Sequence, residues 1–171
     1  MYVIRNPGNG VVPYKRCVSE QGKLTAFPSA IAGMYLIIRD HRHILIMGHS
    51  DCKANAAYMD FIANPKKENE NLPPVGWMES ICGDLKSKFQ TSTFPSLSIE
   101  EKDSFFCKHS VLQQKRNLLS WPFINERVTA SKLFIHPILY NIETQLLHIV
   151  DEGSLKEKPI NNEEMEYIVT Q

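Results

Sequence analysis

The chain has 171 residues, and its 19 Lys and Arg balance its 19 Asp and Glu, so the formal net charge is zero at pH 7. A balanced charge excludes the long-range field that draws basic proteins to nucleic acid. The longest apolar run, AIAGMYLII at 30–38, is far shorter than the roughly 20 residues needed to cross a bilayer, and no signal segment opens the chain. Four cysteines without paired spacing fit a reducing compartment. We therefore expect a cytoplasmic protein with no nucleic-acid or membrane partner.

The first third of the chain alternates segments of strand and helix type. MYVIR at 1–5 predicts a strand that leads into a loop rich in Pro, Gly and Asn. Small and apolar residues at helical spacing predict a buried helix over 25–40, and HILIM at 43–47 is typical of a short parallel strand covered on both faces. These three segments would form a βαβ unit, and a helix at 52–62 would follow.

Helices dominate the middle of the chain, and two strands follow them. The expected segments are a polar loop at 63–74, helices at 74–89, 98–120 and 122–130, and a hairpin at 132–152. Glu100, Glu101 and Asp103 occupy the first turn of the second of these helices, where the helix dipole favours acidic residues. We interpret 1–152 as a single domain and 153–171 as a loosely held polar tail.

The sequence GHSDC at 48–52 is the main candidate for chemistry. It follows HILIM directly and precedes a helix, which places it at the carboxyl end of a strand, where open α/β sheets bind ligands. His49 and Cys52 offer an imidazole and a thiolate, both of which Zn²⁺ favours. A satisfied histidine beside a buried thiol is the alternative interpretation, because a zinc site needs three or four protein ligands. The remaining cysteines and histidines are expected to lie in loops, in the core or isolated from one another.

Four stretches resemble β-class carbonic anhydrases, in the same order and at comparable spacing. They are VIRNPGNGVVPY (3–14), SAIAGMYLIIRDHRHILIMGHSDCKA (29–54), SVLQQKRNLLSWPFINERV (110–128) and KLFIHPILYNIETQLLHIVDE (132–152). The resemblance implies an α/β fold with a parallel sheet flanked by helices and a C-terminal hairpin. It implies zinc as cofactor, with His49 and Cys52 as two of the three protein ligands, and hydration of carbon dioxide to bicarbonate by zinc hydroxide. A homo-oligomer is also implied, and Tyr2 and Pro7 match positions that line the family's substrate pocket.

The resemblance also exposes an absence. In the family, the first zinc ligand and a catalytic Asp–Arg pair come from a Cys-x-Asp-Ser-Arg motif, and this sequence contains none. We assign no catalytic residue in its place: Asp51 is better explained as a helix N-cap or a surface carboxylate. The strand that carries the motif would lie between the strand at 1–5 and HILIM. Its loss would leave two strand edges unpaired, unless the two strands close together or another chain fills the gap.

Three interpretations of the function follow. The first is a carbonic-anhydrase-like protein that is inactive or severely impaired as this 171-residue chain, with a zinc-dependent carbonate dehydratase as its parent. The second is a non-catalytic, degenerate homologue with weak or no zinc binding. The third is an interaction module that pairs an exposed strand edge with a partner.

Overall fold

A computed structural model describes residues 2–26, 28–66, 72–90 and 94–170. Its sheet has strands in the order β1-β2-β3-β4. The strands are β1 (His43–His49), β2 (Phe134–Asn141), β3 (Leu146–Val150) and β4 (Glu157–Pro159). β1 and β2 are parallel, whereas β2, β3 and β4 pair antiparallel. The chain is therefore an α/β protein, as the sequence predicts, and its sheet is mixed because the antiparallel strands β3 and β4 extend the parallel pair.

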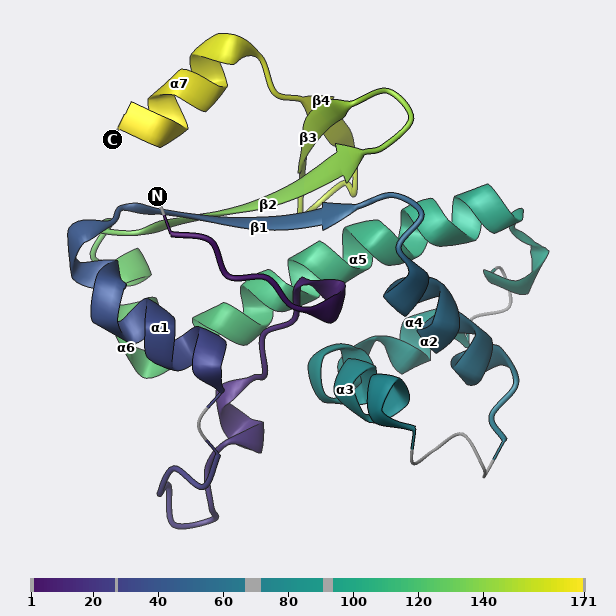
Figure 1. Ribbon diagram of the computed structural model, residues 1–171, viewed down its shortest axis with the longest axis horizontal. Coiled ribbons are helices and arrows are strands. Elements are labelled where there is room, and N and C mark those ends of the chain that lie inside the picture. The colour runs from purple at the N-terminus through teal and green to yellow at the C-terminus, as the bar shows by residue number, and fades with distance from the viewer. Residues whose placement is uncertain (1, 27, 67–71, 91–93, 171) are drawn as a thin grey trace.

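Helices are unevenly distributed over the two faces of the sheet. α5 (Ile99–Leu119) packs against β1 and β2 on one face, where α1 (Ser29–Ile37) and α6 (Pro122–Thr129) also lie (Figure 1). Over the other face lies α7 (Asn162–Thr170). Beyond the end of β1 is a group formed by α2 (Lys53–Ala63), α3 (Pro73–Cys82) and α4 (Lys86–Phe89). Short 3-10 turns connect these elements, at Pro7–Asn9, Tyr14–Arg16, Ile38–Asp40, Gly83–Leu85 and Phe94–Ser96.

α5 joins the two halves of the core. One buried cluster lies between the sheet, α5 and α6, and includes Ile46, Val111 and Leu139. A second lies between α2, α3 and α5 and includes Tyr58, Met78 and Phe106. α5, with 21 residues, contributes buried side chains to both clusters. It therefore fixes the position of the end of β1 relative to α2.

The expected strand at 1–5 is wrong for its described part. Residues 2–6 form no regular structure, and β1 pairs with β2 alone among the described strands. The expected βαβ unit is therefore wrong as well: the parallel partner of β1 is β2, reached through the helices α2 to α6. An apolar segment becomes a strand only when a neighbouring strand takes up its backbone N–H and C=O groups. Residues 2–6 pair with no strand in the described parts of the chain, and they do not pair with β1.

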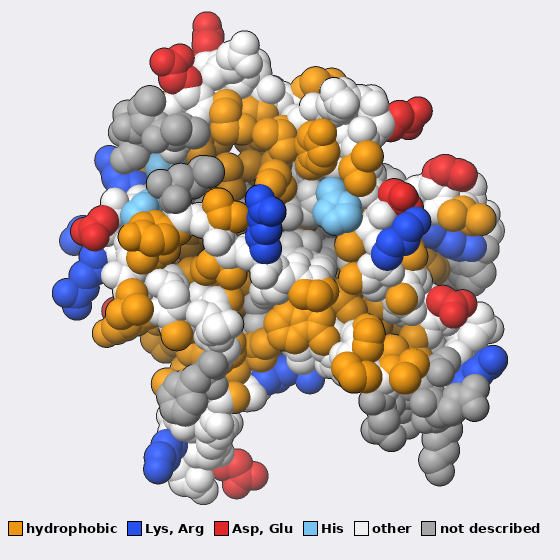
Figure 2. Space-filling model, in the orientation of Figure 1, with side chains coloured by type: hydrophobic (Ala, Val, Ile, Leu, Met, Phe, Trp, Pro, Cys, Tyr) orange, Lys and Arg blue, Asp and Glu red, His pale blue; other side chains and the backbone are white. Residues whose placement is uncertain are grey.

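β1 is also covered less than its sequence predicts. Ile46 faces α5 and is 6% exposed, but Leu45 and Met47 on the opposite face are 41% and 56% exposed. Hydrophobic side chains gather on the surface between α7 and β1 (Figure 2). The all-apolar strand therefore has one buried face and one that is largely open.

The remaining expectations are mostly confirmed. Helices form at 25–40, 52–62, 74–89, 98–120 and 122–130, although α2 ends one residue later and α3 begins one residue earlier than expected, and the hairpin forms within 132–152. The tail differs from expectation, because β4 extends the sheet and α7 buries Ile168. Part of the expected loop, 67–71, lies outside the described residues. Within the described residues no helix is long and apolar enough to span a membrane.

Candidate metal site

The candidate site is the turn from His49 to Cys52, here called the 49–52 turn. His49 ends β1, and Cys52 is the N-cap of α2. The Ser50 N–H donates to the Tyr140 carbonyl (3.0 Å), and the Ser50 hydroxyl accepts from the Ile142 N–H (2.9 Å). Asp51 adopts a left-handed conformation with φ of 53°. The turn is thus tied to the end of β2, and its backbone reverses at Asp51.

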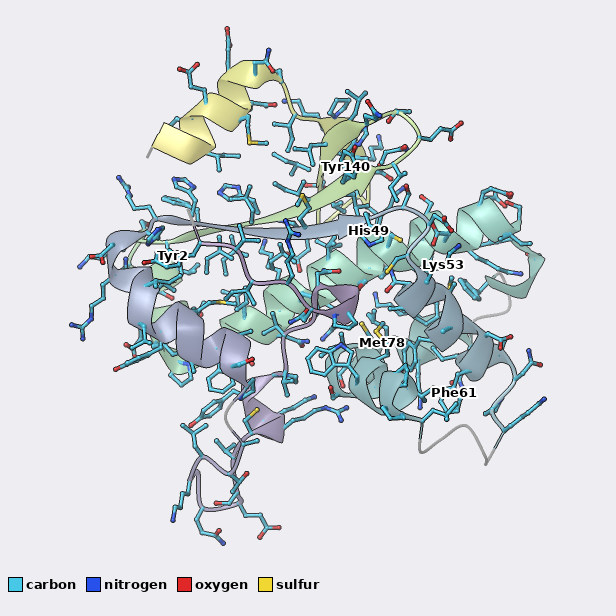
Figure 3. The ribbon with its side chains drawn as sticks, viewed as in Figure 1. Tyr2, His49, Lys53, Phe61, Met78 and Tyr140 are labelled. Atoms are coloured by element: carbon cyan, nitrogen blue, oxygen red, sulfur yellow. The ribbon has the colours of Figure 1, made fainter. Side chains whose placement is uncertain are left out.

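His49 presents one ring nitrogen for a ligand. Its Nδ1 lies 2.9 Å from the Ser50 carbonyl oxygen. A carbonyl can only accept, so Nδ1 carries the hydrogen and the lone pair is on Nε2. The ring lies beside Tyr140, its register partner on β2 (Figure 3). Met47, Tyr140 and Ile142 line an open pocket of about 310 Å³ next to His49.

Cys52, Cys82 and Cys107 are all buried, and Cys52 is 6% exposed. Burial raises the pKa of Cys82 and of Cys107 to about 12, and a negative charge on Cys52 would act in the same direction. Both are therefore neutral at physiological pH. The sequence predicts that Cys82 and Cys107 are core residues, and both are buried.

Asp103 and Cys107 of α5 contact the 49–52 turn, which the sequence did not predict. Asp103 Oδ2 accepts from the Asp51 N–H at 3.0 Å, and the Cys107 thiol donates to the His49 carbonyl at 3.3 Å. Asn55 Nδ2 donates to Cys107 Sγ at 3.4 Å. The only sequence signal was their spacing of four residues on one helix, which places two side chains on one face without saying what that face meets.

The other predicted site residues lie elsewhere. The Tyr2 ring contacts His41 at the start of β1, the end opposite His49 (Figure 3). Pro7 opens a 3-10 turn that contacts β1, and its carbonyl accepts from Trp77 Nε1 at 2.8 Å. Asp51 is a surface carboxylate beside Lys53 (2.9 Å), and the N-cap is Cys52 instead.

Zinc requires at least three protein donors, and the described residues meet this only in part. The imidazole Nε2 of His49 and the thiol of Cys52 are suitable donor types. No group of three or more His, Cys, Asp or Glu in the described parts of the chain is placed to hold a metal ion. The described residues therefore do not fit a complete zinc site.

Sequence comparisons identify relatives. The family model described as "Carbonic anhydrase" matches residues 1–147. Beta carbonic anhydrase 3 of Arabidopsis thaliana is 31% identical over 145 residues, which cover 82% of this chain and 51% of that protein. Beta carbonic anhydrase 1 of Caenorhabditis briggsae is 28% identical over 165 residues, which cover 83% of this chain and 61% of that protein. The chain therefore spans about half to three-fifths of the length of these curated relatives.

Solved structures share the fold. The β-carbonic anhydrase CcaA matches with a TM-score of 0.73 at 22% identity, over 93% of this chain and 71% of that one. A Coccomyxa β-carbonic anhydrase in complex with acetazolamide has a TM-score of 0.61 at 21% identity, over 93% and 62%. A structure from a study of two tetrameric β-carbonic anhydrases of Sordaria macrospora has a TM-score of 0.59 at 16% identity, over 78% and 62%. Since the family model covers most of the sequence and the fold agrees, the chain belongs to the β-class carbonic anhydrase family.

Proposed function

We propose that this chain carries two of the zinc ligands of a β-class carbonic anhydrase, His49 and Cys52, and that as 171 residues it is inactive or severely impaired in carbon dioxide hydration. The proposal rests on the donor groups that the 49–52 turn presents. The turn offers the free Nε2 of His49 and the thiol of Cys52 at the end of β1, with no third suitably placed donor in the described residues. The pocket beside His49 has apolar walls that suit a small apolar molecule such as carbon dioxide. We assign no catalytic residue.

We further propose that the protein is cytoplasmic and forms homo-oligomers. All four cysteines are free, which suits a reducing compartment. The Sordaria macrospora relatives are described as tetrameric, which supports oligomerisation of this chain. Carbon dioxide and bicarbonate would be its ligands only where a further donor completes the metal site.

A non-catalytic interaction module is the second candidate. It is favoured by the one-sided pairing of β1 within the described residues, since a strand edge of this kind can accept an extended segment of another chain. Such a module would need no zinc.

Zinc content and hydration activity test the proposal together. The purified chain is compared with Cys52→Ala and with Cys17→Ala, which removes a buried thiol far along the chain from the turn. We expect less than one zinc per chain by elemental analysis, a further loss in Cys52→Ala but not in Cys17→Ala, and little or no hydration above the buffer rate. One zinc per chain with hydration far above the buffer rate would overturn the proposed impairment. Equal zinc in all three proteins would overturn the assignment of Cys52.

A further inference from the structure

The peptide group between Ser50 and Asp51 makes two hydrogen bonds that point in opposite directions. Its carbonyl accepts from His49 Nδ1 at 2.9 Å. Its N–H donates to Asp103 Oδ2 of α5 at 3.0 Å. One rigid, planar unit therefore lies between the Asp103 carboxylate and the His49 imidazole.

This geometry connects the orientation of the peptide to the state of the ring. If the peptide rotated, its carbonyl would leave His49 Nδ1, and the ring would lose the bond that places the hydrogen on Nδ1 and the lone pair on Nε2. A carboxylate acceptor gives a short, strong bond to a backbone N–H and holds the peptide against this rotation. Hydrogen bonds in such a chain also polarise one another in the same sense.

Two further contacts hold the same segment. Asp51 is left-handed, a conformation that residues other than glycine adopt at a cost, so the Asp103 bond opposes relaxation of the turn. One helical turn along α5, the Cys107 thiol donates to the His49 carbonyl at 3.3 Å. Side chains of α5 thus hydrogen-bond to the backbone on both sides of Ser50.

We propose that Asp103 is a positioning residue that acts through the Ser50–Asp51 peptide to hold the His49 imidazole in the tautomer with its hydrogen on Nδ1 and its lone pair on Nε2. This tautomer is a property of the metal-free chain and does not depend on bound zinc. In metal sites a ligating histidine commonly gives its other N–H to a carboxylate or a backbone carbonyl, and loss of that partner weakens metal affinity by roughly 10- to 100-fold. In this chain the Asp103 carboxylate does not bond the His49 ring directly, because the Ser50–Asp51 peptide group lies between them.

The decisive experiment reads the His49 tautomer in metal-free protein by ¹⁵N NMR at about pH 8, where a histidine ring is ordinarily neutral. The wild type should show His49 with its hydrogen on Nδ1. Asp103→Ala should shift His49 toward the other tautomer and raise the exchange rate of the Asp51 amide about tenfold, as loss of a charge-assisted bond predicts. Asp103→Asn keeps an acceptor oxygen and should restore most of the wild-type pattern. Glu100→Ala removes the same charge from the same helix and should leave His49 unchanged.

Two results would overturn the inference. One is a wild-type His49 with its hydrogen on Nε2, a measurement that needs no variant to fold. The other is an unchanged tautomer and amide exchange in Asp103→Ala. Equal zinc content in the wild type and Cys52→Ala, together with the expected tautomer, would contradict the proposed zinc ligands and leave the role of Asp103 in positioning the ring intact.

Discussion

His109 is a histidine in the interior of α5 that the candidate site does not use. It is 4% exposed, its ring centroid lies 4.3 Å from that of Phe105, and its buried Nδ1 has no hydrogen-bond partner in the described structure. Burial, and then the nearby charges of Lys88 and Arg116, lower its pKa to about 4. The ring is therefore neutral in the folded protein at pH 7.

The lowered pKa of His109 predicts a loss of stability in acid. A histidine in the unfolded chain titrates near 6.5, so the unfolded state binds the proton first as the pH falls. The stability that the neutral ring contributes is complete above about pH 6.5 and is lost progressively toward pH 4, by about 3 kcal/mol in total. We expect His109→Leu to lose less free energy of unfolding between pH 7 and about pH 4.5 in urea titrations. Equal losses would contradict this, since His43 and His136, whose pKa burial also lowers, are present in both proteins.

At the scale of elements, α5 has a complete capping box at its first turn. The Ser98 side chain accepts from the Glu101 N–H at 3.1 Å, and the Glu101 carboxylate accepts from the Ser98 N–H at 2.8 Å. Two N–H groups that a helix start leaves without partners are thereby satisfied. Because α5 carries Asp103 and Cys107 within its first turns, this cap also fixes the helix end that contacts the 49–52 turn.

Removal of the cap should destabilise the whole protein. Ser98→Ala loses the acceptor for the Glu101 N–H and should lower the free energy of unfolding by about 1 kcal/mol in urea titrations. Ser98→Thr keeps a hydroxyl acceptor and should stay close to the wild type. An equal loss in both variants would show that the capping bond is not the cause.

At the scale of the molecule, β1 is an edge strand of the described sheet. β1 pairs with β2 alone among the described strands, and the face that carries Leu45 and Met47 is largely open beneath α7 (Figures 1 and 2). No Lys or Pro occurs in HILIMGH to discourage edge pairing. A free edge beside an apolar face is a surface on which chains associate.

We therefore expect the chain to self-associate as its concentration rises. Met47→Lys places a charge on the open face and should reduce association in sedimentation velocity experiments, with little change in the free energy of unfolding because Met47 is more than half exposed. Leu36→Lys, at an exposed position of α1, is the matched control and should associate as the wild type does. A monomeric wild type at all concentrations would contradict the prediction.

Sequence reasoning succeeded where local pattern decides structure. Apolar periodicity located the helices later seen as α1 to α3, α5 and α6, and the hairpin of β2 and β3. It also placed His49 and Cys52 on a strand-to-helix turn. It failed for residues 2–5 of the expected strand, because strand formation depends on a partner that no local pattern reveals. It also failed for 153–171, where β4 and α7 form in a segment whose polar composition predicts a loosely held tail.

By itself the sequence determined the fold class, the family resemblance and the two candidate zinc donors, because each depends on residue types at fixed local spacing. Only the tertiary structure decided that β1 has an open face and that Asp103 and Cys107 hydrogen-bond to the 49–52 turn. The same is true of the free nitrogen of His49. Asp103 and Asp51 are 52 residues apart in the chain, and a hydrogen bond between them exists only because the packing of α5 against β1 brings them together.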